Sequence, residues 1–205
     1  MRSCAKIAAS DVNRPSCIQL AGSLREHGTA TCPLWLAGQR HHRRAKDSMR
    51  TSASFSPCRT YRYELWREWA GGTDYVVFVG LNPSTADEAE DDATIRRCIG
   101  FAKAWGYGAL CVANLFAYCT RWPQVMKAAP DPVGPDNNQR LLTTAAQAAV
   151  VVAAWGTEGT HLGRDAEVRA LLPRLHCLRL TKHGHPAHPL YLPKVLQPVR
   201  WEAAR

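Results

Sequence analysis

The chain has 205 residues, 46% hydrophobic and 21% charged, the composition of a soluble globular protein with room for a sizeable core. The formal net charge of +9 is uneven, because residues 1–48 hold +5 of it, so the remainder permits a nucleic-acid partner without requiring one. No two of the eight cysteines have C-x-x-C spacing, which argues against a zinc ribbon or a compact iron–sulfur site. The longest apolar run, residues 148–155, is far too short to cross a bilayer, and the N-terminus lacks an apolar signal core. We therefore expect a cytoplasmic protein with reduced thiols and no membrane partner.

Residues 1–48 follow neither a helical nor a strand period, and they end in the basic cluster at residues 40–44. Such a cluster suits a nucleic-acid-binding arm. It also suits a disordered extension translated from upstream of the true start, because Met49 opens the first segment with an ordered pattern. We favour the extension and predict a single α/β domain over residues 49–205.

From residue 61 to residue 69 the sequence alternates as a half-exposed strand does. Short apolar runs then predict four strands buried on both faces, at residues 75–79, 109–113, 150–154 and 176–180. Helical spacing separates them at residues 95–105, at about 135–145, where Pro135 suits a first turn, and at 164–172. A long proline-rich loop is expected over residues 121–135. The fold class is therefore α/β, a three-layer α/β/α sandwich with a mostly parallel four-stranded central sheet.

Each predicted buried strand is followed by polar or aromatic residues. In open α/β sheets, ligands bind just beyond the carboxyl ends of the strands. We therefore expect the residues after the four strands to build one pocket on one edge of the sheet. They are Asn82, Ser84 and Asp87; Asn114 and Arg121; Trp155; and Lys182, His185 and His188.

The first loop carries Asn82 directly before Pro83, which favours an extended backbone at the asparagine. An amide there can orient a water molecule or a base edge, because it both donates and accepts hydrogen bonds. The alternative is a simple turn, in which Asn82 and Ser84 bond their own backbone. Ser84 with Asp87 resembles a helix capping box, and for Ser84 we favour that structural interpretation.

Acids are dense in the same loop. Asp87, Asp91 and Asp92 could hold a divalent cation, or supply a general base for water. Asp92 also suits the N-cap of the helix that begins near Ala93, and capping is the favoured account of it. No spacing here is diagnostic of a metal, so we expect neither a metal site nor another cofactor.

The last loop places three histidines within six residues, beside Lys182. His185 and His188 each precede a proline, and either could bind a metal, donate hydrogen bonds or stabilise a developing anion. A solvated loop is the alternative, and His183 is the first of the three to discard. Arg121 is a cation that stands beside the aromatic residue Trp122, and such a pair can bind a phosphate and stack on a base. A tryptophan packed under its loop, with the arginine in solvent, is equally common.

On these segments the chain resembles a bacterial family known as domain of unknown function 1643, over residues 56–201. The matching text is Tyr61-Arg62-Tyr63, Leu81-Asn82-Pro83-Ser84-Thr85-Ala86-Asp87, Asp92-Ala93-Thr94-Ile95-Arg96-Arg97-Cys98, Asn114-Leu115-Phe116-Ala117, Trp155-Gly156, Thr181-Lys182, Gly184-His185-Pro186 and His188-Pro189-Leu190-Tyr191. The resemblance implies a fold and domain boundaries, but no activity.

More weakly, the order of motifs is similar to that of the uracil-DNA glycosylase superfamily. The similar segments are Gly80-Leu81-Asn82-Pro83-Ser84, Asn114 to Pro123 with Cys119 and Arg121, Trp155-Gly156, and His185-Pro186-Ala187-His188-Pro189-Leu190. The resemblance implies a uracil-DNA-glycosylase-like fold and hydrolysis of an N-glycosidic bond. In it, Asn82 or Asp87 would orient water and His185 or His188 would stabilise the leaving base. Arg121 and Lys182 would bind phosphate, and the substrate pocket would be completed by Pro83, Ser84, Asn114 and Trp155. Ser84 departs from the superfamily pattern, which has glycine there.

Three functions remain open. The first is a hydrolase that acts on a nucleobase, a nucleotide or a nucleic acid, with a free nucleotide or single strand as the easier substrate because flipping a base from a duplex costs a few kcal/mol. The second is a non-catalytic module that binds a nucleotide or nucleic acid. The third is a metal-dependent phosphohydrolase that uses Asp87, Asp91 and Asp92.

Overall fold

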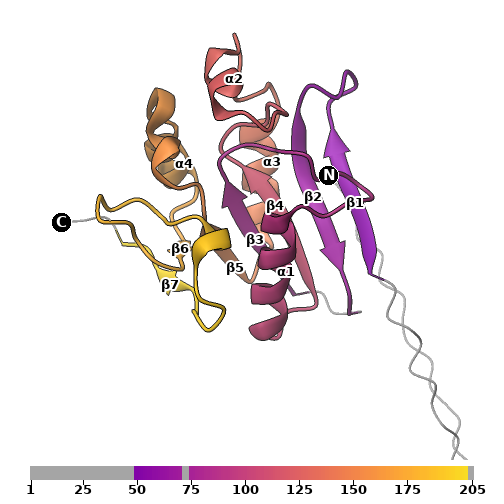
Figure 1. Ribbon diagram of the computed structural model, residues 1–205, viewed down its shortest axis with the longest axis vertical. Coiled ribbons are helices and arrows are strands. Elements are labelled where there is room, and N and C mark those ends of the chain that lie inside the picture. Colours follow the sequence, from indigo (N-terminus) through magenta and orange to yellow (C-terminus); the bar gives the residue numbers. More distant parts are fainter. Residues whose placement is uncertain (1–48, 71–73, 203–205) are drawn as a thin grey trace, which may run out of the picture. The chain divides into compact units, whose positions relative to one another are not determined.

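A computed structural model describes residues 49–70 and 74–202, so the expected extension at residues 1–48 lies outside the described residues. Seven strands form one sheet in the order β1-β2-β4-β3-β5-β6-β7 (Figure 1). The strands are β1 (Arg50–Phe55), β2 (Arg62–Glu68), β3 (Tyr75–Gly80), β4 (Ala109–Asn114), β5 (Val150–Ala153), β6 (Leu175–Cys177) and β7 (Val199–Arg200). The α-helices are α1 (Ala93–Ala104), α2 (Pro123–Ala128), α3 (Asn137–Ala146) and α4 (Arg164–Leu171), and two 3₁₀ segments are η1 (Thr157–Gly163) and η2 (Pro189–Tyr191).

The predicted number of four strands is wrong, because the sheet has seven. The four expected buried strands are present as β3, β4, β5 and β6, and they run parallel. The strands β1, β2 and β7 extend the sheet through antiparallel pairs: β2 with β4, β1 with β2, and β7 with β6. The sequence does not signal β1, because Arg-Thr-Ser-Ala-Ser-Phe has no apolar run, and β7 has only two residues. Both are edge strands of the sheet, where fewer side chains need be apolar.

The strand β6 ends at Cys177, three residues earlier than expected. The backbone beyond it closes on itself: Thr181 N donates to the His185 carbonyl at 2.8 Å, and Ala187 N donates to the Arg179 carbonyl at 2.8 Å. These bonds satisfy the loop locally, so it does not extend the ladder with β5.

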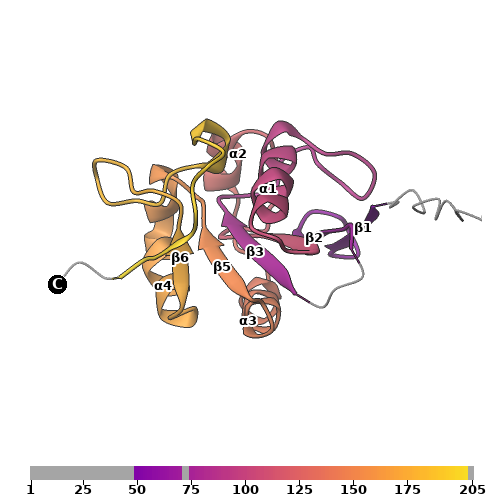
Figure 2. The ribbon, with the colours of Figure 1, turned by 90° about the horizontal axis from the view of Figure 1, so that it is seen from below.

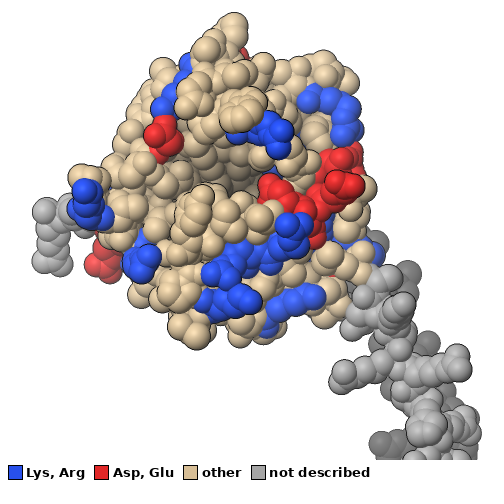
Figure 3. Space-filling view, viewed as in Figure 1, with Lys and Arg blue, Asp and Glu red and all other residues tan. Residues whose placement is uncertain are grey.

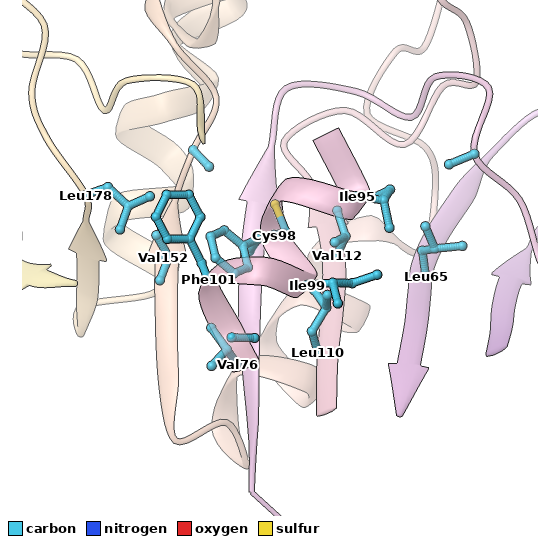
Figure 4. Packing of buried hydrophobic residues seen from close by; sticks show 14 of the residues in the cluster. Leu65, Val76, Ile95, Cys98, Ile99, Phe101, Leu110, Val112, Val152 and Leu178 are labelled. Atoms are coloured by element: carbon cyan, nitrogen blue, oxygen red, sulfur yellow. The ribbon is translucent and has the colours of Figure 1, made fainter. Parts of the chain in front are cut away.

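On one face of the sheet, α1 covers the strands (Figure 2). Its residues Ile95, Cys98, Ile99 and Phe101 recur at helical spacing and are buried against strand residues that include Val76, Leu110, Val112 and Val152 (Figure 4). Burying a side chain such as Ile95 contributes about 1.5–3 kcal/mol. This stripe therefore fixes α1, and with it the loop that leads into α1, against the sheet.

The other face is covered by α3 and α4 (Figure 2). Residues Val77 and Val79 of β3 point into this second core, where they join Leu141 of α3 and Val168 of α4. Val76 and its neighbour Val77 thus belong to opposite cores, which explains why β3 is apolar at successive positions. The three layers agree with the sequence-based expectation.

Helix ends follow the expected chemistry in part. Asp92 is the N-cap of α1, with Oδ1 accepting from the Ile95 amide at 2.8 Å, and Gly106 takes a positive φ of 87° just after the helix. The expected long loop contains the helix α2, and α3 begins at Asn137 rather than at Pro135. None of the helices within residues 49–70 and 74–202 has the length and apolar content needed to cross a membrane.

Candidate functional site

A cavity of about 340 Å³ lies at the carboxyl ends of β3, β4 and β5, beside the N-terminal end of α1. The space-filling view shows this face hollowed, with acidic and basic side chains around the hollow (Figure 3). The volume is in the range of small-molecule sites. Five of the ten candidate residues from the sequence line it, and they come from all four expected loops: Asn82, Ser84, Asn114, Trp155 and His188.

The side-chain amide of Asn82 has a fixed orientation. Its Nδ2 atom donates to the carbonyl of Pro83 at 3.0 Å and to the carbonyl of Thr120 at 2.7 Å, which uses both of its N–H groups. The opposite orientation would set Oδ1 against two carbonyl oxygens. The oxygen Oδ1 accepts no hydrogen bond from a described residue, so it is the atom with which Asn82 can meet a ligand.

The side chain of Asn114 is 4% exposed at the end of β4. Its Oδ1 atom has no hydrogen-bond partner among the described residues, although it is fully shielded from solvent. A buried acceptor left without a donor costs about 1–3 kcal/mol. An unsatisfied amide in a cavity wall is therefore suited to a ligand that supplies the missing donor.

The imidazole of His188 stands at the start of η2. Its Nδ1 atom accepts from the amide of Leu190 at 3.4 Å, which leaves the ring proton of the neutral form on Nε2. Burial lowers the pKa of His188, and the charge of Asp92 opposes this only in part. At neutral pH, His188 is therefore an uncharged imidazole that can donate from Nε2.

The indole ring of Trp155 is packed into the protein interior. Its ring packs against Trp201, with centroids 5.6 Å apart, and a Cβ added to Gly159 would lie 2.2 Å from its Cδ1 atom. The indole Nε1 is buried without a partner among the described residues. The buried ring of Trp155 is therefore not available for base stacking, and its Nε1 remains a donor without a described partner.

Sequence reasoning missed Arg62, Asp92 and Glu158 as residues of the cavity wall. Arg62 is 3% exposed, although an arginine in an alternating strand usually points to solvent. Its only signal was its place in the Tyr-Arg-Tyr segment that carries the family resemblance. Capping was the favoured account of Asp92, and the structure shows that Asp92 both caps α1 and lines the cavity.

The other five candidate residues are not part of the cavity wall. The Asp87 carboxylate accepts hydrogen bonds from two amides of its own turn, at 2.8 and 2.9 Å. Pro83 is buried. Arg121 and Lys182 are exposed, and Arg121 lies over the Trp122 ring at 5.7 Å. His185 is held in its own hairpin, where its amide bonds the Thr181 hydroxyl at 3.3 Å.

The three acids that were candidates for a metal have separate tasks. Asp87 closes its turn and Asp92 caps α1, while Asp91 forms an ion pair of 2.7 Å with Arg67. The expected capping box of Ser84 and Asp87 is not formed, because Asp87 bonds Ala89 and Glu90 instead. In the part of the chain that the structure describes, no three acidic, histidine or cysteine side chains meet as a metal site.

A second cavity, of about 370 Å³, lies between the C-terminal ends of α3 and α4, and His176 lines it. Most of its other lining residues lie at the ends of α3 and α4 or in the turns that lead into β5 and β6, so the cavity lies at the amino ends of these strands. Ligands of open parallel sheets bind at the opposite ends. We therefore take the cavity of Asn82 and His188 as the functional site.

Comparisons with known proteins identify a family. The sequence model of the family described as "Protein of unknown function (DUF1643)" matches residues 62–190, a range that includes all the candidate residues discussed above. No curated protein and no solved structure matches the chain, so neither comparison shows the resemblance to uracil-DNA glycosylases or a fold shared with them. The family match covers more than half of the sequence, and the chain belongs to the DUF1643 family.

Proposed function

We propose that the cavity is the active site of a hydrolase that cleaves the N-glycosidic bond of a nucleotide. The observation that carries the proposal is the pairing of Asn82 and His188 in one cavity wall. Asn82 offers an oriented acceptor, and His188 offers a neutral N–H donor. Hydrolysis of this bond needs both, an acceptor for the attacking water and a donor for the departing base.

In the proposed reaction the oxygen of a water molecule attacks C1′ of the sugar while Asn82 Oδ1 accepts a hydrogen bond from that water. The C1′–N bond breaks, and its electron pair leaves with the base. His188 Nε2–H donates to the base atom that gains the negative charge, which can lower the barrier by about 3 kcal/mol. The carboxylate of Asp92 receives the proton of the water, and the base is then protonated from solvent.

Substrate recognition is assigned to Asn114 and Trp155. The amide of Asn114 can pair with a base edge, and its unsatisfied Oδ1 gains a donor from the base. The indole of Trp155 adds a donor from Nε1. Because extruding a base from a duplex costs a few kcal/mol, a free nucleotide or a single strand is the preferred substrate.

The proposal is tested by incubating the full chain with each nucleoside, nucleoside monophosphate and short single strand, and measuring released base by chromatography. Asn82→Ala and His188→Ala are each expected to lower kcat about 100- to 1000-fold while the variants still bind substrate. His183→Ala is the matched control, because His183 lies exposed in the same loop and outside the cavity wall.

Turnover that persists unchanged in both Asn82→Ala and His188→Ala would remove the catalytic assignment. Binding by the wild-type protein without release of base from any substrate would identify a binding module instead of an enzyme.

A further inference from the structure

The described residues include three buried arginines, and they differ in how their charge is balanced. Arg67 pairs with Asp91 at 2.7 Å, and Arg164 pairs with Glu167 at 2.8 Å. Arg62 forms no ion pair with a described carboxylate, and the charge of Asp92 acts on it only at longer range. Burial lowers the pKa of Arg62 as a result. A buried cation without a partner is costly unless a ligand provides the counter-charge.

The hydrogen bonds of Arg62 show which part of its guanidinium is unused. Nη1 donates to the carbonyl of Ala86. Nε is buried without a partner, and Nη2 makes no hydrogen bond with a described residue. Nε and Nη2 together form the edge that binds two oxygens of a phosphate or carboxylate at once. Arg67 makes the comparison clear, because its Nε, Nη1 and Nη2 all have partners.

The surroundings of Arg62 also favour an anion. Arg62 lines the cavity together with Thr94, which occupies the first turn of α1. The amino end of a helix carries partial positive charge, and the Thr94 hydroxyl makes no hydrogen bond with a described residue. The Asp92 carboxylate accepts a hydrogen bond from the Ile95 amide and forms none with the Arg62 guanidinium.

We infer that Arg62 and the first turn of α1 form an anion subsite that takes the phosphate monoester of the substrate. Two coplanar N–H donors suit any anion that presents two oxygens, and the assignment of this anion to phosphate rests on the proposed function. The subsite selects a nucleoside monophosphate over a nucleoside. It also selects against an oligonucleotide without a terminal phosphate, because Arg62 is only 3% exposed and a continuous backbone at the rim does not reach it.

The test measures the Tm and the Kd of the full chain with inorganic phosphate, acetate, nucleosides and nucleoside monophosphates, at ionic strength matched with chloride. Phosphate is expected to raise the Tm of the wild-type protein, and monophosphates are expected to bind at least about tenfold more tightly than nucleosides. Arg62→Lys is expected to lose both effects, because an ammonium cannot bind two oxygens in one plane. Arg67→Lys is the matched control: its baseline Tm falls, but phosphate still raises it.

The subsite is contradicted if phosphate gives the wild-type protein no more protection than chloride, or if acetate protects as well as phosphate. It is equally contradicted if Arg62→Lys keeps full affinity, or if an unphosphorylated oligonucleotide binds as tightly as a monophosphate. If Arg62→Lys does not fold, ¹⁵N spectra of the wild-type protein replace this comparison. Phosphate is then expected to shift one arginine Nε–H signal. A spectrum that does not change overturns the inference.

The two proposals fail separately. Binding of monophosphates that depends on Arg62 but releases no base would remove the hydrolase and keep the subsite. Release of base at equal rates from nucleosides and nucleotides, unaffected by Arg62→Lys, would remove the subsite and keep the hydrolase.

Discussion

Gly80 and Asn114 are paired in the parallel register of β3 and β4, and the Asn114 side chain fills the space above the glycine. A Cβ added to Gly80 would lie 2.8 Å from Asn114 Nδ2, a distance that real contacts do not tolerate. The φ of Gly80 is not in the left-handed region, so the glycine is required for space and not for backbone conformation.

We therefore expect Gly80→Ala to displace the Asn114 amide and to abolish substrate binding, with a loss of about 1–3 kcal/mol in stability. Gly100→Ala is the control, because nothing lies within 4 Å of a Cβ at this exposed position of α1. That change should stabilise the helix by up to about 1 kcal/mol and leave binding intact. Titration calorimetry and thermal melts measure both quantities. A Gly80→Ala protein that binds normally would show that Asn114 is not needed.

Burial lowers the pKa of His188 from its ordinary value of 6.5. As the pH falls through 6.5, the unfolded chain gains a proton at this residue while the folded protein resists it, so the free energy of unfolding decreases until the lower folded-state pKa is reached. We expect His188→Asn to flatten the decline of Tm between about pH 7 and pH 5, relative to the wild-type protein. His183→Asn should leave the decline unchanged. Parallel Tm curves for the wild-type protein and His188→Asn would contradict a buried neutral imidazole.

In the ligand-free protein, removing the charge of Arg67 should cost much more stability than removing the charge of Arg62. Arg67→Met leaves the Asp91 carboxylate without its ion-pair partner and removes the hydrogen bond to the Asp87 carbonyl. It should therefore lower the free energy of unfolding by on the order of 3 kcal/mol. Arg62→Met removes an unpaired buried charge and one hydrogen bond, so its stability should stay within about 1 kcal/mol of the wild-type value. Denaturant unfolding of both variants measures the difference. Equal losses would mean that Arg62 is structural.

Cys58 is the most reactive thiol expected among the five cysteines of residues 49–70 and 74–202. Hydrogen bonds with the Ser56 and Thr60 side chains lower the pKa of Cys58 to about 7, and its side chain is exposed. Burial raises the pKa of Cys111 and Cys177. With iodoacetamide at about pH 8, Cys58 should be alkylated first, as followed by peptide mass spectrometry. The reaction should slow in Ser56→Ala; alkylation of Cys111 at the same rate would contradict this order.

The sequence predicted the parts of the fold that depend on burial alone. Residues such as Val77 are apolar because both faces of β3 are covered, and that pattern marked the strand. The edge strand β1 was not predicted, because its residues are exposed or only partly buried and its sequence therefore has no apolar run. The N-cap role of Asp92 was predictable and is confirmed, since it depends only on the chain beside it.

The candidate site was predictable to the level of its loops and not to the level of single side chains. Asn82 lies two residues after the end of β3, so its position at the sheet edge follows from topology. His185 and His188 could not be separated, because the local hairpin of residues 179–187 decides which of them reaches the cavity. Arg62 required the three-dimensional structure, because only the packing of α1 and its loop over the start of β2 encloses the guanidinium.

A crystal of the full chain soaked with a saturating nucleoside monophosphate tests the account most directly, because it locates the ligand without depending on turnover. We predict density for the nucleotide between Asn82 Oδ1 and His188 Nε2, with two phosphate oxygens on Nε and Nη2 of Arg62. Density in the cavity of His176, or a cavity of Asn82 and His188 that stays free of nucleotide at saturation, would contradict it.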